Sequence, residues 1–425
     1  MVRFATALLA LSATALGATT ITCSASSQCP EDKPCCSQYG ECGTGAYCLG
    51  GCDPQASYSI GACAPMPICE EKSYTWENLD SAILNTEYLG DASEKDWVYS
   101  GYPKIQNDSL VVTMPKNSVG TLFANTHYIW YGTISGKVKS SRGKGVVTAF
   151  ILLSDVKDEI DYEWVGADLT AVQTNYYWQG VLDWHNSANA SVSGEDTFND
   201  WHTYEIDWQP DTTKWIIDGT VMRTLNKNDT YNSTSNTYQY PQTPSRMQLS
   251  LWPAGASTSA QGTIDWAGGD INWDSEDIQD KGYYYAEFGK IDVTCYATPD
   301  GTVTKGNSSY LYTSDSGLQA DVEVTGNSTV LGSLGATGLD MDYGANSSST
   351  VTGSDSVPTN EGGSGGRTGT DSSTGSDSAS TTDTTFNQGT TTSASSKGGA
   401  AGQNERVLRG SFFAVLVAVV VLVTL

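Results

Sequence analysis

Basic residues are scarce in this chain of 425 residues. Lys and Arg number 22 and His three, against 48 Asp and Glu, so the formal net charge at pH 7 is −26. This excess of negative charge excludes nucleic acid as a partner and fits an acidic extracellular glycoprotein. His185 and His202 have no further His or Cys ligands near them in the sequence. We therefore expect no metal and no cofactor.

Long apolar runs are absent from the interior of the chain and occur only at its ends. Residues 1–17 combine Arg3 with an apolar run and a small-residue cleavage position, which predicts a secretory signal peptide rather than a core helix. The apolar run from Phe412 to Leu425 is short for a bilayer span and follows a polar spacer. Residues 398–425 therefore have the layout of a glycosylphosphatidylinositol (GPI) attachment signal, with Gly398 as the attachment residue. A tail anchor is the alternative, and the signal peptide argues against it.

Large apolar residues are few between residues 302 and 397, where Ser, Thr, Gly and Asp dominate. Such a segment buries too little apolar surface to fold, so it predicts a disordered, O-glycosylated stalk. Asn-x-Ser/Thr acceptors agree with passage through the secretory pathway and occur at Asn107, Asn189, Asn228, Asn232, Asn307, Asn327 and Asn346.

Cysteine is missing between Cys69 and Cys295, whereas residues 23–63 hold eight: Cys23, Cys29, Cys35, Cys36, Cys42, Cys48, Cys52 and Cys63. In a secreted chain this crowding predicts a small module held together by disulfides, and the oxidising compartment argues against a zinc site. Spacing alone leaves the pairing open. If the module pairs internally, a Cys69–Cys295 bridge would staple the two ends of a domain over residues 69–297.

Strand-like alternation with intervening turns fills that domain, and helix signals are few. The segments that alternate lie at residues 145–153, 201–208, 214–217 and 221–223, with Asp218-Gly219 as one of the turns. This pattern predicts an all-β fold, a β-sandwich of two sheets.

Four carboxylates crowd into the run Asp158-Glu159-Ile160-Asp161-Tyr162-Glu163. On a strand, Glu159, Asp161 and Glu163 share one face, while the alternate positions are large and apolar. Close carboxylates raise one another's pKa, so one holds a proton while another stays ionised, as a retaining glycosidase requires. A solvated acidic face or a calcium site is the alternative, and the apolar alternate positions argue against both.

The same run resembles the E-x-D-x-E catalytic strand of glycoside hydrolase family 16, and with Trp164-Val165-Gly166 it looks most like the fungal Crh (congo-red hypersensitive) transglycosylases. Blocks at residues 199–208, 250–255 and 262–269 are also similar to that family. The resemblance implies a jelly-roll fold. It also implies that Glu159 is the nucleophile, Asp161 an auxiliary acid and Glu163 the general acid/base.

The cysteine module resembles the hevein-type chitin-binding module. The resemblance implies binding of N-acetylglucosamine by Ser37, Tyr39 and Tyr47, while Glu41 stands where that family usually has another aromatic residue. A disulfide knot that binds nothing is the alternative.

Aromatic side chains near the family-like blocks are candidate sugar platforms, because a pyranose face stacks on a flat ring. The candidates are Trp252, Trp178, Tyr177 and Trp266. Each could equally be a core residue of the sandwich.

Together these features predict a secreted enzyme of the fungal cell wall, held at the plasma membrane by a GPI lipid anchor. The resemblance implies that it cleaves chitin and transfers it to β-glucan or chitin. A hydrolase of chitin or β-glucan and a noncatalytic chitin-binding lectin are the alternatives, and a structural mannoprotein is a third.

Overall fold

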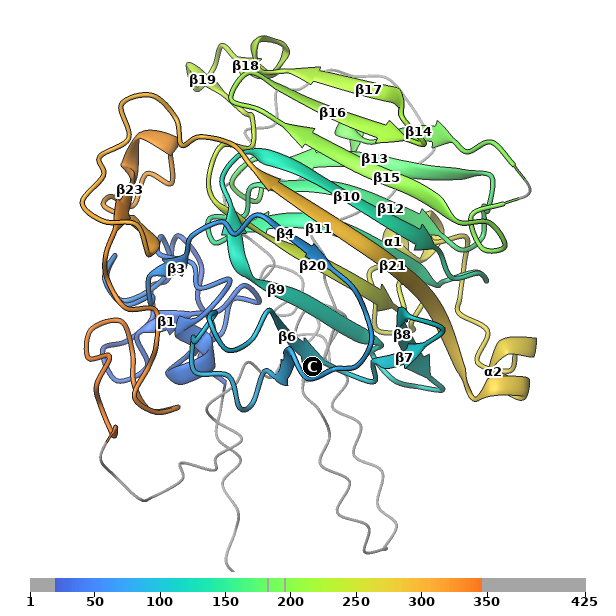
Figure 1. The fold of residues 1–425 in the computed structure, drawn as a ribbon, viewed down its shortest axis with the longest axis horizontal. Helices are drawn as coiled ribbons and strands as arrows, with labels where there is room; N and C mark the ends of the chain where they lie inside the picture. Colours follow the sequence, from blue (N-terminus) through green and yellow to red (C-terminus); the bar gives the residue numbers. More distant parts are fainter. Residues whose placement is uncertain (1–19, 182, 195, 346–425) are drawn as a thin grey trace, which may run out of the picture.

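The computed structural model describes residues 20–181, 183–194 and 196–345 (Figure 1). The predicted signal peptide (residues 1–17), the GPI signal with Gly398, and the predicted stalk beyond residue 345 lie outside the described residues. Among the helices of the described ranges, none has the length and apolar character needed to cross a membrane.

Two eight-stranded sheets form most of the molecule. The first sheet has the order β17-β16-β15-β10-β21-β8-β7, with β4 also paired to β21. Its strands are β4 Lys72–Tyr74, β7 Lys104–Gln106, β8 Ser109–Pro115, β10 Gly132–Lys139, β15 His202–Trp208, β16 Thr212–Ile217, β17 Thr220–Asn226 and β21 Tyr283–Cys295.

The second sheet has the order β14-β13-β12-β11-β20-β9-β6-β5, so β12 lies in its interior. Its strands are β5 Ala82–Leu84, β6 Trp97–Ser100, β9 Thr121–Ile129, β11 Val147–Ser154, β12 Glu159–Val165, β13 Ala171–Tyr177, β14 Ala188–Ser191 and β20 Ser245–Trp252. The two sheets pack face to face around a core of apolar side chains, so the predicted β-sandwich is confirmed.

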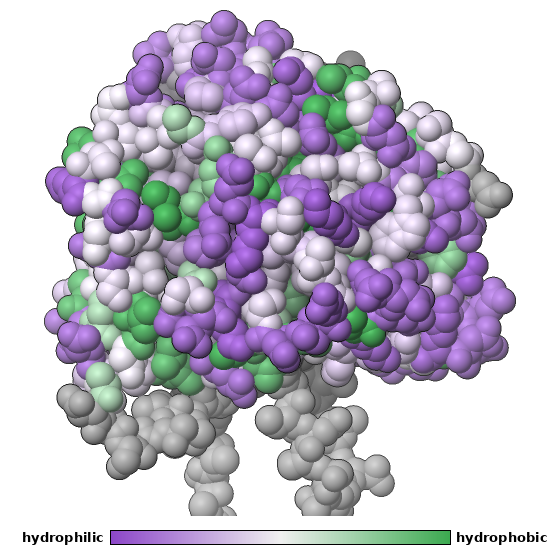
Figure 2. Space-filling view, viewed as in Figure 1, coloured by the Kyte–Doolittle hydropathy of each residue, from purple (hydrophilic) through white to green (hydrophobic). Residues whose placement is uncertain are grey.

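The remaining elements are short. The strands are β1 Cys35–Cys36, β2 Cys42–Gly43, β3 Met66–Pro67, β18 Tyr231–Asn232, β19 Thr237–Tyr238, β22 Ser309–Tyr312 and β23 Val322–Thr325. The helices are α1 Gln261–Trp266 and α2 Glu276–Lys281, with 3-10 turns η1 Gly45–Cys48, η2 Trp184–Asn186, η3 Lys227–Thr230 and η4 Gln319–Asp321. Hydrophilic side chains predominate on the face shown in Figure 2, with apolar ones scattered among them.

Hydrogen bonds between the sheets hold β12 in place. The hydroxyl of Tyr162 donates to the backbone carbonyls of Glu205 at 3.2 Å and Ile216 at 3.0 Å, both on the first sheet. In return, Trp215 Nε1 donates to the carbonyl of Asp161 at 2.9 Å. Because these buried polar groups satisfy each other across the core, β12 has little freedom to slide or rotate.

All ten cysteines lie in the described residues and all form disulfides. The pairs are Cys23–Cys36, Cys29–Cys42, Cys35–Cys48, Cys52–Cys63 and Cys69–Cys295. The prediction that the module pairs internally and that the last bridge joins the ends of the domain is therefore confirmed. A zinc site built from these thiols is excluded.

Replacing both Cys69 and Cys295 by Ser should lower the free energy of unfolding by about 5 kcal/mol, because this bridge closes a loop of 226 residues in the unfolded chain. The same exchange at Cys52 and Cys63, 11 residues apart, should cost only about 3 kcal/mol. Denaturant unfolding of both double variants measures the difference. A smaller loss for the long loop than for the short one would contradict this prediction.

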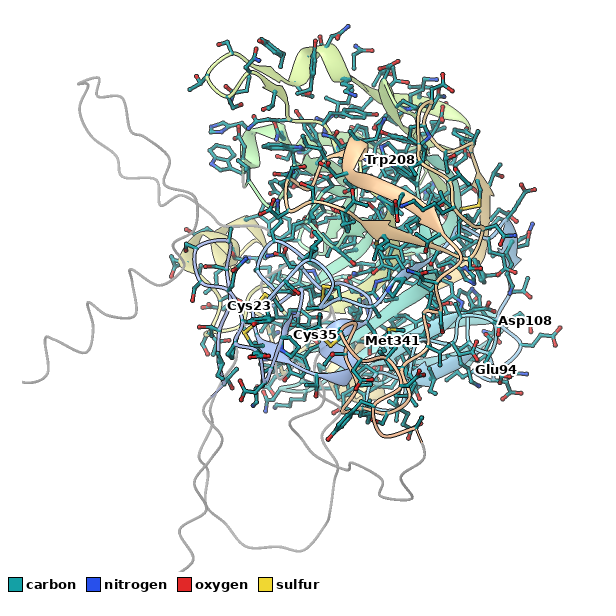
Figure 3. All side chains as sticks on the ribbon, turned by 90° about the vertical axis from the view of Figure 1, so that its left-hand side faces the viewer. Cys23, Cys35, Glu94, Asp108, Trp208 and Met341 are labelled. Atoms are coloured by element: carbon teal, nitrogen blue, oxygen red, sulfur yellow. A yellow bond between two sulfur atoms is a disulfide. The ribbon has the colours of Figure 1, made fainter. Side chains whose placement is uncertain are left out.

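The prediction of a disordered stalk from residue 302 is wrong for residues 302–345. Strands β22 and β23 form a three-stranded sheet with β3, and Tyr310, Tyr312, Val322 and Val324 are buried in the main core. Beyond them, a segment up to Met341 packs against the cysteine module, as Figure 3 shows for Met341 and Cys35. The Ser/Thr-rich composition of the whole segment concealed two short alternating strands. Two such strands are enough to fold when β3 and the core already offer a surface to pack against.

Candidate active site

Strand β12 places Glu159, Asp161 and Glu163 on the face of the second sheet that points away from the core. Their alternate neighbours Ile160, Tyr162 and Trp164 belong to the core cluster, as the alternation predicted. The three acids, called the carboxylate row below, are nevertheless only 5%, 1% and 3% exposed. Burying a charged carboxylate this completely costs free energy of folding, unless the group is paired, hydrogen-bonded or protonated.

Asp158 fixes the start of β12 and is separate from the carboxylate row. Its carboxylate accepts hydrogen bonds from the backbone N–H groups of Gln179, Gln242 and Thr243, and from Thr243 Oγ1, at 2.7 to 3.1 Å. Burial nevertheless raises its pKa to about 6. Asp158 therefore ties two loops to the strand that carries the row, and acts as a positioning residue.

Burial and mutual repulsion set the protonation of the carboxylate row. Burial raises the pKa of Glu159 to about 7, while a hydrogen bond from Asp161 opposes the rise. The pKa of Asp161 lies well above its ordinary value because of burial and the charges of Glu159 and Glu163. That of Glu163 is also well raised, by burial and by Glu159. All three carboxyl groups therefore hold protons more readily than exposed ones, and the ionisation of one disfavours the ionisation of its neighbours.

Two oxygens of the row have no hydrogen-bond partner among the described residues. They are Asp161 Oδ1 and Glu163 Oε1, and both are buried. Asn175 lies opposite Asp161 on β13, and its Oδ1 is also buried without a hydrogen-bond partner among the described residues. A polyhydroxylated substrate supplies the hydroxyl groups that would satisfy all three.

Asp161→Ala should move the acidic limb of the pH profile of kcat/KM to higher pH, by about one unit. The hydrogen bond from Asp161 lowers the pKa of Glu159, so its loss lets that pKa rise and delays the ionisation of Glu159 as the pH increases. Asp161→Asn keeps a donor and should shift the limb less. An unmoved limb in the Ala variant would mean that Asp161 does not govern Glu159.

Tyr177 lies beside the row, and Trp178 is the next residue in the chain. Tyr177 stands opposite Glu159 in the register of β12 and β13, and its pKa is raised by burial and by the charges of the three acids. Both aromatic residues are buried, and Trp178 Nε1 has no hydrogen-bond partner among the described residues. Tyr177 thus borders the Glu159 end of the row, and Trp178 follows it in the chain.

Trp252 and Trp266 lie at the opposite end of the row. Their rings stack at 6.1 Å, with Trp252 fully buried and Trp266 half-buried. Trp266 Nε1 donates to Gln173 Oε1 at 2.8 Å, and Gln173 pairs with Glu163 in the sheet register. Of the two rings, only that of Trp266 is partly accessible to a ligand. The buried ring of Trp252 packs against it.

Sequence reasoning missed the polar residues of β20. Arg246, Gln248 and Ser250 share the outward face of the second sheet, two strands away from the carboxylate row. Polar residues at every second position of a buried strand were the signal that could have found them. His202 is a buried hydrogen-bonding residue, with Nδ1 2.7 Å from Asp218 Oδ2.

The three module residues expected to bind sugar, Ser37, Tyr39 and Tyr47, differ in their surroundings. Tyr47 is 4% exposed and packs in a cluster with Leu331 and Ala336, so its ring has no face open to a sugar. Ser37 and Tyr39 instead line a pocket between the module and the second sheet. The C-terminal segment that sequence reasoning left disordered is what covers Tyr47.

Comparison with known proteins gives consistent similarities. Residues 91–268, which include the carboxylate row, match the profile of glycosyl hydrolases family 16. The chain is 60% identical to Crh-like protein 2 of Aspergillus fumigatus over all of both chains. It is 51% identical to Congo red hypersensitive protein 2 of Saccharomyces cerevisiae, over 77% of this chain and 71% of that protein. Among solved structures, the Crh5 transglycosylase in complex with NAG is similar, with a TM-score of 0.51 and 27% identity over 62% of this chain and 97% of that one.

Proposed function

The chain belongs to the Crh-type branch of glycosyl hydrolases family 16, and we propose from this premise that it cleaves β-1,4-linked chitin and transfers the released chain to β-glucan or chitin. Membership makes it a glycosidase or transglycosylase of cell-wall polysaccharide. The choice of chitin as donor and of glucan as acceptor is our proposal. The observation that carries the proposal of glycosidic cleavage is the carboxylate row on an interior strand, with three buried acids and two oxygens that have no hydrogen-bond partner among the described residues.

The row supports a double displacement. Glu159, whose carboxylate accepts a hydrogen bond from Asp161, attacks the anomeric carbon, while Glu163, whose pKa is well raised by burial and by Glu159, gives its proton to the departing glycosidic oxygen. The product of this step is a glycosyl ester on Glu159 and a free sugar hydroxyl. Glu163, now ionised, takes the proton from the acceptor hydroxyl, whose oxygen displaces Glu159. Both steps invert the anomeric carbon, so its configuration is retained overall.

Transfer, rather than hydrolysis, is favoured by the environment of the row. The three acids are at most 5% exposed, so water reaches them poorly when a sugar chain fills the site. The similar Crh5 protein is itself described as a transglycosylase. Secretion, the GPI anchor at Gly398 and retention in the fungal wall belong to the same proposal, because a tether raises the concentration of both polymers near the enzyme.

The products distinguish this function from its rivals. Full-length protein is incubated with chitin oligosaccharides, with and without a labelled β-1,3-glucan oligosaccharide, and the products are analysed by mass spectrometry. Labelled products enlarged by N-acetylhexosamine units support the proposal. Shortened chitin alone indicates a hydrolase, and no conversion at all indicates a chitin-binding lectin.

A further inference from the structure

The cysteine module is fixed against the second sheet. The backbone N–H of Gly51 donates to Asp155 Oδ1 at 2.8 Å and to Tyr128 Oη at 3.1 Å. Lys157 Nζ and the nearly buried carboxylate of Asp53 form an ion pair at 3.0 Å. These contacts join residues far apart in the sequence. The module is therefore packed rigidly against the sandwich and is not a separate domain on a flexible linker.

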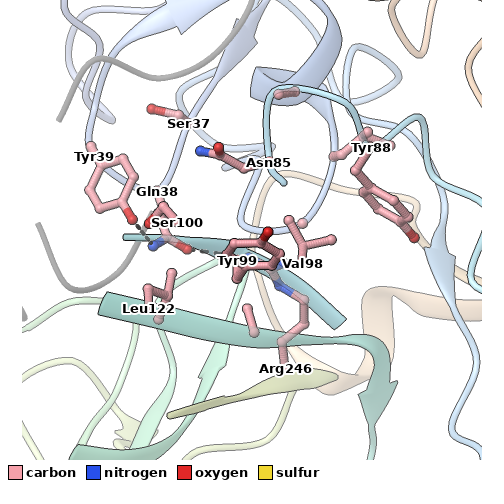
Figure 4. Close-up of a pocket in the computed structure, with 14 residues that line it drawn as sticks. Ser37, Gln38, Tyr39, Asn85, Tyr88, Val98, Tyr99, Ser100, Leu122 and Arg246 are labelled. Carbon is pink, nitrogen blue, oxygen red and sulfur yellow. Dashed lines mark hydrogen bonds between the residues drawn. The ribbon is translucent and has the colours of Figure 1, made fainter. Parts of the chain in front are cut away.

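The docked module turns two of its three expected sugar-binding residues, Ser37 and Tyr39, toward the second sheet. Figure 4 shows Gln38 between Tyr39 and Arg246 and bonded to both. Gln38 Nε2 donates to Tyr39 Oη at 2.7 Å, and Gln38 Oε1 accepts from Arg246 Nη2 and from Gln248 Nε2, each at 3.4 Å. Ser37 lines the same space.

This space lies on the same face of the sheet as the carboxylate row. In the register, Leu153 pairs with both Glu159 and Arg246, so Arg246 stands level with Glu159, two strands away. Neighbouring strands are about 4.8 Å apart, which puts the two backbones about 10 Å apart along the sheet. The pocket then extends further in the same direction, over Ala124 of β9 and Ser100 of β6.

The pocket has the lining expected of a sugar site. It is open to solvent on one side and has a cavity volume of about 70 Å³, so a bound sugar unit would lie partly outside it. Its wall combines tyrosine rings and apolar side chains with three buried polar atoms that have no hydrogen-bond partner among the described residues. These atoms are Asn85 Oδ1, Tyr88 Oη and Arg246 Nε. Tyr88 and Arg246 are each 8% exposed, so a missing hydrogen bond at Tyr88 Oη or Arg246 Nε costs free energy that a ligand group could recover.

We propose that the module and the outer strands of the second sheet form a distal subsite, which grips an N-acetylglucosamine unit of the same chitin chain whose glycosidic bond lies at the carboxylate row. This inference rests on the proposed function and deepens it. The module thereby selects long donors, because only a chain that spans from the row to the pocket gains the distal contacts. Short donors reach the row and leave the pocket empty.

The test compares donors of different length in a variant of the pocket. The double variant Asn85→Ala/Tyr88→Phe removes two of the unpaired atoms and little volume. Its kcat/KM should fall about tenfold for chitooctaose and stay unchanged for chitobiosyl fluoride, which is too short to reach from the row into the pocket, since two hydrogen bonds are lost only with the long donor. Tyr238→Phe, on the exposed β19, is the matched control and should change neither value.

A second measurement separates this inference from the proposed function. Titration calorimetry of chitooctaose is carried out with full-length Glu159→Gln protein, with and without the two pocket exchanges, so that binding is read without turnover. Weaker binding in the pocket variant supports the subsite even if the reaction proves to be different. Equal binding, together with an undiminished preference for the long donor, overturns the subsite and leaves the proposed function standing.

Discussion

Glu159→Gln should lower the rate of donor cleavage by about 10⁴-fold or more, because the amide cannot form the glycosyl ester on which both steps depend. The fold should survive the exchange. Glu159 is 5% exposed, and a neutral amide of the same shape removes a buried charge that the protein otherwise keeps from water. Steady-state cleavage of chitin oligosaccharides measures the first effect, and thermal unfolding measures the second.

Glu205→Gln is the control for this variant. Glu205 is also a strand carboxylate with a raised pKa, caused mainly by burial, but it lies on β15 of the other sheet. Its loss should leave the cleavage rate within about twofold of the wild type, as expected for a partly exposed site far from the chemistry. If the Glu159 variant kept about a tenth of the wild-type rate, Glu159 would not be the nucleophile.

Glu163→Ala should lower the cleavage of ordinary chitin oligosaccharides by about 10²- to 10⁴-fold, because the leaving oxygen then receives no proton. A donor with fluoride as leaving group needs no such proton, so its first step should run at nearly the normal rate. The second step still lacks a base and should become limiting. Stopped-flow release of fluoride should therefore show a burst followed by a slow phase.

Azide distinguishes the two glutamates. Added to Glu163→Ala, azide needs no general base, so it should speed the slow phase and give the glycosyl azide of retained configuration. Added to Glu159→Ala, it should occupy the place of the missing carboxylate and give the inverted product. The opposite assignment of products would exchange the proposed roles of Glu159 and Glu163.

Strand β12 was predictable because its information is local. The alternation around Asp161 fixes which side chains share a face, and the alternating segment 145–153 just before it forms its neighbour β11. The structure agrees with both. The two cysteines outside the module were predictable by elimination, since the remaining eight pair among themselves.

The surroundings of the row were not predictable because they depend on contacts between distant segments. Gln38 meets Arg246 across 208 positions, and no local pattern in either segment indicates the other. Residues 309–325 fold because β3 and the core provide a surface for them, although their composition is that of a stalk. The same effect buries Tyr47, which the sequence presents as a surface aromatic residue.

The most direct test of the account is the mass of the Glu163→Ala protein during its reaction with a chitobiosyl fluoride. We predict that the protein gains the mass of two N-acetylhexosamine units while fluoride is released, and that peptide mapping places this mass on Glu159. Fluoride release without any covalent adduct would contradict the account. The acetamido group of the donor, or water attacking directly, would then perform the step assigned to Glu159.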